Sequence, residues 1–177
     1  LVQMLNVLSH FPLAEWGHGA ARTIHAIAET ARRAYADRSE YLGDPDFVDV
    51  PVAELLDPAY AARLAGEIDM ARATPSERVA PGLDLPAESA ETTHFSVVDA
   101  QGNAVANTYT LNFSYGVGFM APGTGVLLNN ELDDFSAKPG APNAYGLVGG
   151  EANAVAPGKR PLSSMTPTIV LDEGEVF

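Results

Sequence analysis

Apolar side chains near the start of the chain recur every three or four residues, which is the spacing of one helix face. The first such run ends at Pro12, since proline disrupts a helix interior. The second run is longer, and its charged residues lie largely outside the apolar stripe, which predicts an exposed polar face. The first run contains Leu1, Met4, Leu5 and Leu8; the second contains Ile24, Ile27, Ala28, Ala31 and Tyr35, with Arg22, Glu29, Arg32 and Arg33 outside the stripe.

A third helix is indicated by the residues that would begin it. Asp57 is a good capping residue, and Pro58 suits the first helical position because its missing N–H needs no partner there. The stretch 74–89 is rich in proline and small polar residues, which is typical of an exposed connection. We therefore expect a helical first half that ends in a flexible tether. The apolar face of the third helix comprises Tyr60, Leu64 and Ile68.

The pattern changes to that of strands after the tether. Residues 94–99 and 104–111 flank the turn residues 100–103, which predicts a β-hairpin. Such a hairpin would place Thr92 and Thr110 side by side at its open end.

Two later apolar runs, at 126–128 and 168–171, also suit buried strands. Helices therefore precede strands instead of alternating with them. This order favours an α+β domain in which helices and sheet form separate layers.

The threonine pair at the start of the hairpin carries candidate chemistry. If the bond between Glu91 and Thr92 were cut, a free α-amine would stand beside the Thr92 hydroxyl and could act as its general base. Taken alone, Thr92 and Thr93 are better explained as β-branched residues that enter a strand.

Four long stretches, in this order along the chain, resemble the γ-glutamyltranspeptidase family. The resemblance covers essentially the whole chain, and no single stretch carries it. The stretches are 35–47 (YADRSEYLGDPDF), 107–112 (NTYTLN), 127–136 (LLNNELDDFS) and 159–168 (KRPLSSMTPT).

The resemblance implies an N-terminal-nucleophile (Ntn) hydrolase, an αββα sandwich made as one precursor that cuts itself into a large and a small subunit. Residues 1–91 would be the C-terminal helical part of the large subunit, with the processing linker at 74–91. Residues 92–177 would be the N-terminal part of the small, catalytic subunit. Only part of the sandwich is expected here, with a helical first half and a β-rich second half.

The resemblance also implies roles for individual residues, beginning with Thr92 as nucleophile and Glu91–Thr92 as processing site. Thr110 matches the threonine that hydrogen-bonds the nucleophile. Some relatives carry an amide where Glu131 stands, and Asp133 is expected to be an ordinary solvated carboxylate. The substrate-binding positions are Asn112, Glu131 and Asp134 for the α-ammonium group, Ser163 and Ser164 for the α-carboxylate, and Tyr145 in a lid over 138–150.

The implied activity is transfer and hydrolysis of γ-glutamyl groups from glutathione and other γ-glutamyl amides. Amino acids or dipeptides would be acceptors, the rest of both subunits would be partners, and no cofactor is expected. A β-lactam side-chain acylase (glutaryl or cephalosporin acylase) of the same fold remains an alternative. A non-catalytic assembly module or an inactive fragment is a second one.

Composition narrows these alternatives only a little. With 23 acidic and 10 basic residues, the net charge of −13 argues against a nucleic-acid partner. The lack of cysteine removes disulfides and thiolate ligands, and the four histidines lack metal-ligand spacing, so we expect no catalytic metal.

No apolar run approaches the ~20 residues that span a bilayer. Family members are usually periplasmic or secreted, which is the location implied here, although no signal peptide is visible.

Residues 1–5 open in the middle of an apolar helical pattern, and residues 174–177 stop where a strand resumes after a turn. We therefore expect an internal piece of a longer polypeptide. In the family, an oxyanion-hole glycine pair follows this segment and a substrate-binding arginine precedes it. Because each lost oxyanion donor costs ~10²–10³ in rate, the piece alone is expected to be nearly inactive and to remain uncut before Thr92.

Overall fold

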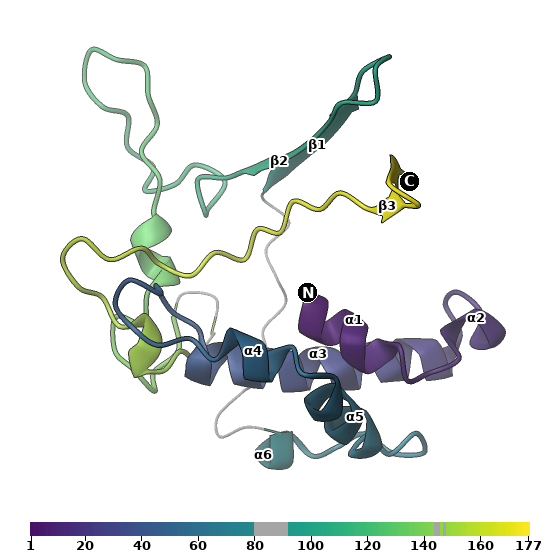
Figure 1. Ribbon diagram of the computed structural model, residues 1–177. Helices are drawn as coiled ribbons and strands as arrows, with labels where there is room; N and C mark the ends of the chain where they lie inside the picture. Colours follow the sequence, from purple (N-terminus) through teal and green to yellow (C-terminus); the bar gives the residue numbers. More distant parts are fainter. Residues whose placement is uncertain (80–91, 144–145, 147) are drawn as a thin grey trace. The chain divides into compact units, whose positions relative to one another are not determined.

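The computed structural model describes residues 1–79, 92–143, 146 and 148–177. The chain forms two compact units, which Figure 1 shows as ribbons. In the described part, all six α-helices belong to the first unit and all four strands to the second. The expectation of a helical first half followed by strands is thus confirmed. Unit 1 comprises Leu1–Pro86 and Phe135–Leu162, and unit 2 comprises Ala87–Asp134 and Ser163–Phe177.

Unit 1 is organised around one long helix, α3 (Ala21–Tyr41), beside which α1 (Val2–Leu8) and α5 (Pro58–Gly66) lie in Figure 1. Its hydrophobic core forms mainly between α1 and α5, because those helices supply its buried apolar side chains. The core residues are Val7, Ala61, Leu64, Ala65 and Ile68, with Phe11 and Tyr60 packed against them. The short helices are α2 (Leu13–Trp16), α4 (Val52–Leu55) and α6 (Ser76–Val79).

Helix α5 begins as the sequence predicts. Asp57 Oδ1 accepts hydrogen bonds from the backbone N–H groups of Ala59 (2.6 Å) and Tyr60 (3.4 Å), and Pro58 is the first helical residue. The Tyr60 hydroxyl donates to Asp37 Oδ2 at 2.9 Å. Burial, together with this hydrogen bond to Asp37, raises the pKa of Tyr60 to about 12. The capping contacts join residues within three positions of one another, so they do not depend on the packing of the rest of the chain.

The buried face of α3 differs from the predicted one. Ile24 and Ile27, expected in the core, are 58% and 42% exposed. Glu29 and Arg33, expected in solvent, are 2% and 8% exposed. The prediction was wrong because it assumed that charged side chains face water, whereas these two charges compensate each other inside the unit. The other buried residues of α3 are Thr23, Ala26 and Thr30.

The Glu29 carboxylate is satisfied by three donors. Its Oε2 accepts from Arg33 Nη1 at 2.7 Å, and its Oε1 accepts from Arg32 Nη1 at 2.8 Å and from the Thr74 backbone N–H at 3.2 Å. Both arginines also bind Thr74, through its carbonyl or its hydroxyl. A buried ion pair is tolerated when its remaining hydrogen-bonding groups find partners, and here the chain at Thr74 supplies them.

Replacing Glu29 with glutamine is expected to destabilise unit 1 in a pH-dependent way. Burial alone would raise the pKa of Glu29, but hydrogen bonds from Thr74, Arg33 and Arg32 lower it to about 2. Because the folded pKa lies below the unfolded value of 4.5, the carboxylate stabilises the fold above about pH 5 and loses that contribution as pH falls towards 2.

The expected loss for Glu29→Gln is ~3 kcal/mol of unfolding free energy at pH 7, with little difference from wild type near pH 2. Denaturant unfolding of the full-length protein from pH 2 to 7 measures it. Glu67→Gln is the matched control, because Glu67 pairs with Arg63 while half exposed. Equal losses at pH 7 and pH 2 for Glu29→Gln would contradict this account.

Unit 2 contains the predicted hairpin, formed by strands β1 (Thr93–Val98) and β2 (Ala104–Tyr109). The strands are antiparallel, with Thr93 opposite Tyr109. The turn is closed by Asp99, whose Oδ1 accepts from the backbone N–H groups of Gln101 and Asn103, both at 2.9 Å. Gly102 adopts φ +83°, a conformation that glycine reaches without strain.

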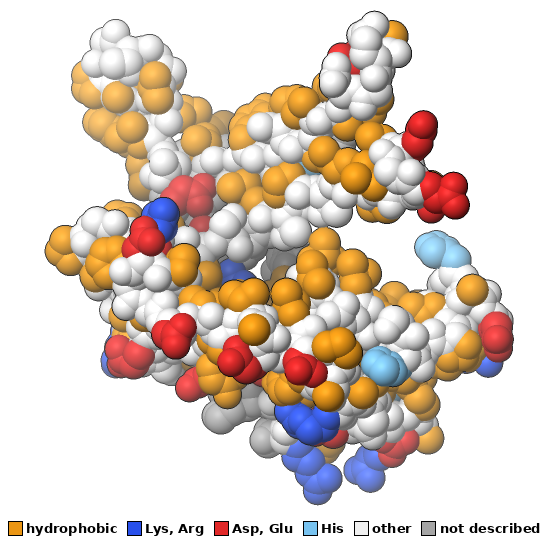
Figure 2. Space-filling model, in the orientation of Figure 1, with side chains coloured by type: hydrophobic (Ala, Val, Ile, Leu, Met, Phe, Trp, Pro, Cys, Tyr) orange, Lys and Arg blue, Asp and Glu red, His pale blue; other side chains and the backbone are white. Residues whose placement is uncertain are grey.

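One face of the hairpin is apolar and exposed. Figure 2 shows hydrophobic side chains along the hairpin. Every residue of β1 is exposed, Phe95 and Val97 among them. Each strand is hydrogen-bonded to the other along one edge only, since the described residues provide no further strand in this sheet.

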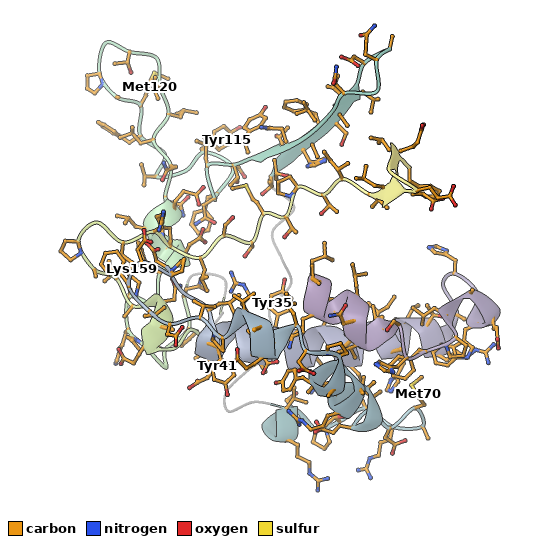
Figure 3. All side chains as sticks on the ribbon, in the orientation of Figure 1. Tyr35, Tyr41, Met70, Tyr115, Met120 and Lys159 are labelled. Atoms are coloured by element: carbon orange, nitrogen blue, oxygen red, sulfur yellow. The ribbon has the colours of Figure 1, made fainter. Side chains whose placement is uncertain are left out.

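The two later apolar runs form less sheet than predicted. In the run 126–128, Leu127 makes only an isolated bridge to Met120, which Figure 3 labels on the loop after β2. In the run 168–171, only the last residue belongs to a strand, β3 (Leu171–Asp172), which pairs with β4 (Glu175–Val176). A strand forms only where a neighbouring strand hydrogen-bonds its backbone N–H and C=O groups. In the described part of unit 2, these two runs have such partners at only a few residues.

Residues 135–162 belong to unit 1, where they contact the region around the end of α3. Arg160 donates from Nη2 to Asp44 Oδ1 (2.6 Å) and from Nε to Asp44 Oδ2 (3.0 Å). These hydrogen bonds hold the pKa of Asp44 well below its usual range. Gly150 N–H donates to the Ser39 carbonyl at 2.9 Å, and a Cβ on Gly149 would lie 2.0 Å from Ser136 Oγ. The Gly149–Gly150 pair is therefore explained by close packing.

Candidate active site

The two threonines that the sequence singled out meet at the open end of the hairpin. The β1–β2 register continues one step beyond Thr93 and Tyr109, which sets Thr92 opposite Thr110. The Thr92 hydroxyl donates to Thr110 Oγ1 at 3.3 Å. Thr92 is exposed, while Thr110, which accepts its hydrogen bond, is half-buried.

Asn112 continues this hydrogen-bond chain. Its backbone N–H donates to Thr110 Oγ1 at 3.0 Å, and its side-chain Nδ2 donates to the carbonyl of Asn130 at 3.2 Å. Asn112 has φ +72°, in the left-handed region that a non-glycine residue rarely occupies. Such a conformation persists only where the surroundings enforce it, and it is common at functional sites.

Two acidic side chains follow on a short 3₁₀-helix, η1 (Glu131–Asp134). Side chains three residues apart eclipse each other in a 3₁₀-helix, so Glu131 and Asp134 share one side of η1. The helix is started by Asn129, whose Oδ1 accepts from the Glu131 backbone N–H at 2.9 Å. The two carboxylates predicted to bind an ammonium group are therefore presented together.

Asp133 differs from expectation. It is half-buried, with its Oδ2 atom shielded from solvent, so it is not an ordinary solvated carboxylate. It also lies off the side that Glu131 and Asp134 share, since it is out of the three-residue register. The spacing of acidic residues alone did not indicate this burial, which depends on how η1 packs.

Ser163 and Ser164 lie in unit 2, on an exposed segment without regular secondary structure. Ser163 Oγ accepts from the Met165 backbone N–H at 3.1 Å, a local turn in which the hydroxyl serves as acceptor. Their role towards a substrate carboxylate stays a prediction. Glu91 and Tyr145 lie outside the described residues, and with them the cleavage junction and the tip of the predicted lid.

His94 lies on the same face as Thr92, because strand residues two apart point the same way. Its Nδ1 is 2.6 Å from Thr108 Oγ1 on the opposite strand, and its Nε2 is 3.1 Å from Ser96 Oγ. Both ring nitrogens thus contact hydroxyls of the hairpin, as expected for a residue that stabilises it.

The described residues include no group of three or more acidic, histidine or cysteine side chains that could hold a metal ion. Within those residues, too, every helix is too short or too polar to cross a membrane.

Asn130 was not recognised from the sequence. It precedes an acidic run and follows another asparagine, a pattern typical of an ordinary turn. In the structure it binds Asn112 and Phe113, residues 18 and 17 positions earlier. A contact at that separation leaves no periodic signal.

Comparison with known proteins identifies the family of the chain. The family model for gamma-glutamyltranspeptidase matches residues 1–177. The glutathione hydrolase proenzyme of Escherichia coli (strain K12) is 57% identical over 177 residues, which is 100% of this chain and 30% of that protein. The glutathione hydrolase proenzyme of Pseudomonas aeruginosa is 57% identical over 157 residues, covering 89% and 28% of the two chains. The chain therefore spans less than a third of the length of these relatives.

Among solved structures, the cephalosporin acylase from Bacillus halodurans superposes with a TM-score of 0.67 at 25% identity, over 93% of this chain and 26% of that one. The fold class is accordingly that of an Ntn hydrolase, of which this chain contains part. Because the family model and these relatives match essentially its whole length, the chain belongs to the gamma-glutamyltranspeptidase family.

Proposed function

We propose that the full-length protein containing this chain transfers and hydrolyses γ-glutamyl groups, with glutathione as a donor. The observation that carries this proposal is the Thr92–Thr110 hydroxyl contact of 3.3 Å at the open end of the hairpin. A cut between Glu91 and Thr92 would turn this oriented hydroxyl into an N-terminal nucleophile that carries its own base.

The reaction then proceeds in two acyl transfers. Thr92 Oγ attacks the δ-carbonyl of the donor while the Thr92 α-amine takes its proton, and the amine passes a proton to the leaving amine. The resulting ester is cleaved by water or by the amine of an amino acid or dipeptide. Thr110 keeps the Thr92 oxygen in position, and its own oxygen is held by Asn112 N–H at 3.0 Å. Two acyl transfers replace one difficult amide cleavage.

The donor's α-ammonium would be held by Asn112, Glu131 and Asp134. An ammonium group has three donors and a positive charge, which two carboxylates and an amide oxygen match well. Ser163 and Ser164 would donate hydroxyl hydrogen bonds to the α-carboxylate. Tyr145 would close over the bound glutamyl group.

Residues 1–91 would form the end of the large subunit, and residues 92–177 the start of the small subunit. Within unit 1, Arg160 binds Asp44 by two side-chain hydrogen bonds, and Gly150 binds Ser39. These contacts join positions on either side of Thr92, so they would hold the two products of cleavage together without a covalent link. We place the protein in the periplasm or outside the cell, as is usual in the family.

A β-lactam side-chain acylase is the second candidate, supported by the similarity to the cephalosporin acylase. A glutaryl group resembles a glutamyl group but lacks its α-ammonium. Binding a glutaryl donor would bury Glu131 and Asp134 without a cation, which is unfavourable. The acidic pair on η1 therefore favours the γ-glutamyl donor.

We expect the full-length protein to prefer γ-glutamyl-p-nitroanilide over glutaryl-7-aminocephalosporanic acid by at least ~10² in kcat/KM, because a site built around polar contacts rejects a ligand that lacks them. Steady-state kinetics with both donors measures this ratio. Equal or reversed preference would favour the acylase.

Mass spectrometry of the same preparation tests the non-catalytic alternative. Two fragments that meet at Glu91 and Thr92 support the enzyme, whereas a persistently intact, inactive chain supports an assembly module.

A further inference from the structure

Asn130 makes hydrogen bonds to the segment that follows β2. Its backbone N–H donates to the Leu111 carbonyl at 3.1 Å, and its own carbonyl accepts from Asn112 Nδ2 at 3.2 Å. Its side-chain Oδ1 accepts from the Phe113 backbone N–H at 2.9 Å. Three polar groups of one residue thus hold three consecutive residues of the turn, including the left-handed Asn112.

Asn130 also fixes the beginning of η1. Its carbonyl accepts a second hydrogen bond, from the Asp133 backbone N–H at 3.1 Å, and Glu131 is the next residue along the chain. The same carbonyl oxygen therefore binds both the Asn112 side chain and the helix that carries Glu131 and Asp134. A displacement of Asn130 would shift the amide and the acidic pair relative to each other.

We propose that Asn130 is a positioning residue, which sets the distance between Asn112 and the Glu131–Asp134 pair and so makes the site select donors with an α-ammonium. The inference rests on the proposed function, because it concerns the ammonium subsite of that reaction. An ammonium group is small and directional in its three N–H bonds, so it can use all the acceptors only if they are correctly spaced.

A structural asparagine in the same unit serves for comparison. Asn103 closes the hairpin turn, where its Nδ2 donates to Asp99 Oδ2 at 2.7 Å. Asn103 is exposed and binds no residue of the candidate site. Asn103→Ala therefore removes the same type of side chain from the same unit without touching the ammonium subsite.

The test compares two donors in the full-length protein, γ-glutamyl-p-nitroanilide and glutaryl-p-nitroanilide. Asn130→Ala removes the Oδ1 acceptor of the Phe113 N–H and keeps the backbone carbonyl. We expect KM for the γ-glutamyl donor to rise about tenfold with kcat within about twofold, because the turn that carries Asn112 is held less firmly and the ammonium binds more weakly, while the nucleophile is unchanged. Turnover of the glutaryl donor and cleavage before Thr92 should remain as in wild type. Asn130→Asp keeps the Oδ1 acceptor and should restore KM to within about threefold of wild type. Asn103→Ala should leave both donors unaffected.

Three results would overturn the inference. One is an equal loss for both donors in Asn130→Ala, which would indicate general disruption. Another is a wild-type KM for the γ-glutamyl donor in Asn130→Ala, which would leave the proposed function standing because the wild type still turns over that donor. The third is a wild type that turns over neither donor, which removes the proposed function and this inference together. If Asn130→Ala does not mature, Asn130→Ser is judged by the same two-donor ratio.

Discussion

Thr92→Ala in the full-length protein is expected to abolish both cleavage before residue 92 and turnover of γ-glutamyl donors. The same hydroxyl would attack the preceding carbonyl during processing and the donor carbonyl afterwards, so one substitution removes both reactions. We expect kcat/KM to fall by at least ~10⁴, as is usual when the nucleophile of a covalent mechanism is lost. Mass spectrometry follows the cleavage, and release of p-nitroaniline follows the turnover.

Thr93→Ala is the matched control, because the two threonines are adjacent but point to opposite faces of β1. Thr93→Ala should still mature and remain active. A Thr92→Ala protein that matured normally would remove Thr92 from the site.

Asp134→Asn is expected to reduce kcat/KM for γ-glutamyl donors by ~10²–10³ while leaving cleavage before Thr92 intact. The substitution removes the negative charge that would pair with the donor's ammonium, and losing one partner of a desolvated charge pair costs about 2–5 kcal/mol. Processing involves no glutamyl group, so the acidic pair has no part in it. Steady-state kinetics of the processed variant measures the loss.

Asp133→Asn provides the control for that experiment. It is the same isosteric change on the same 3₁₀-helix, but on a residue outside the shared side of Glu131 and Asp134. We expect less than about a threefold effect on kcat/KM, since no charge facing the donor changes. If Asp133→Asn were the more damaging variant, the assignment of the ammonium site to Asp134 would be incorrect.

That the 177-residue piece stays uncut before Thr92 and is nearly inactive stays a prediction, and Glu91 lies outside the described residues.

Several features of the fold and of the candidate site were predictable because their signals are local. Asp57 and Pro58 begin α5 by contacts within three residues. The hairpin turn closes through Asp99 and Asn103, and the alternation of its strands then places Thr92 beside Thr110. Local propensity and side-chain alternation do not depend on what packs against the element, so a single sequence is enough to read them.

The tertiary structure alone decided the features that depend on contacts between distant positions. Glu29 and Arg33 are buried because the chain returns at Thr74 with the hydrogen-bond groups that they need, 45 and 41 residues away. Asn130 contacts Asn112, 18 residues earlier, because the turn after β2 folds back onto it. A sequence specifies which side chains are charged or polar, and from that it determined here the helices, the hairpin and the family, and it predicts the nucleophile. Whether a polar group meets solvent or a partner is set by the packing of remote segments, and that only the folded chain decides.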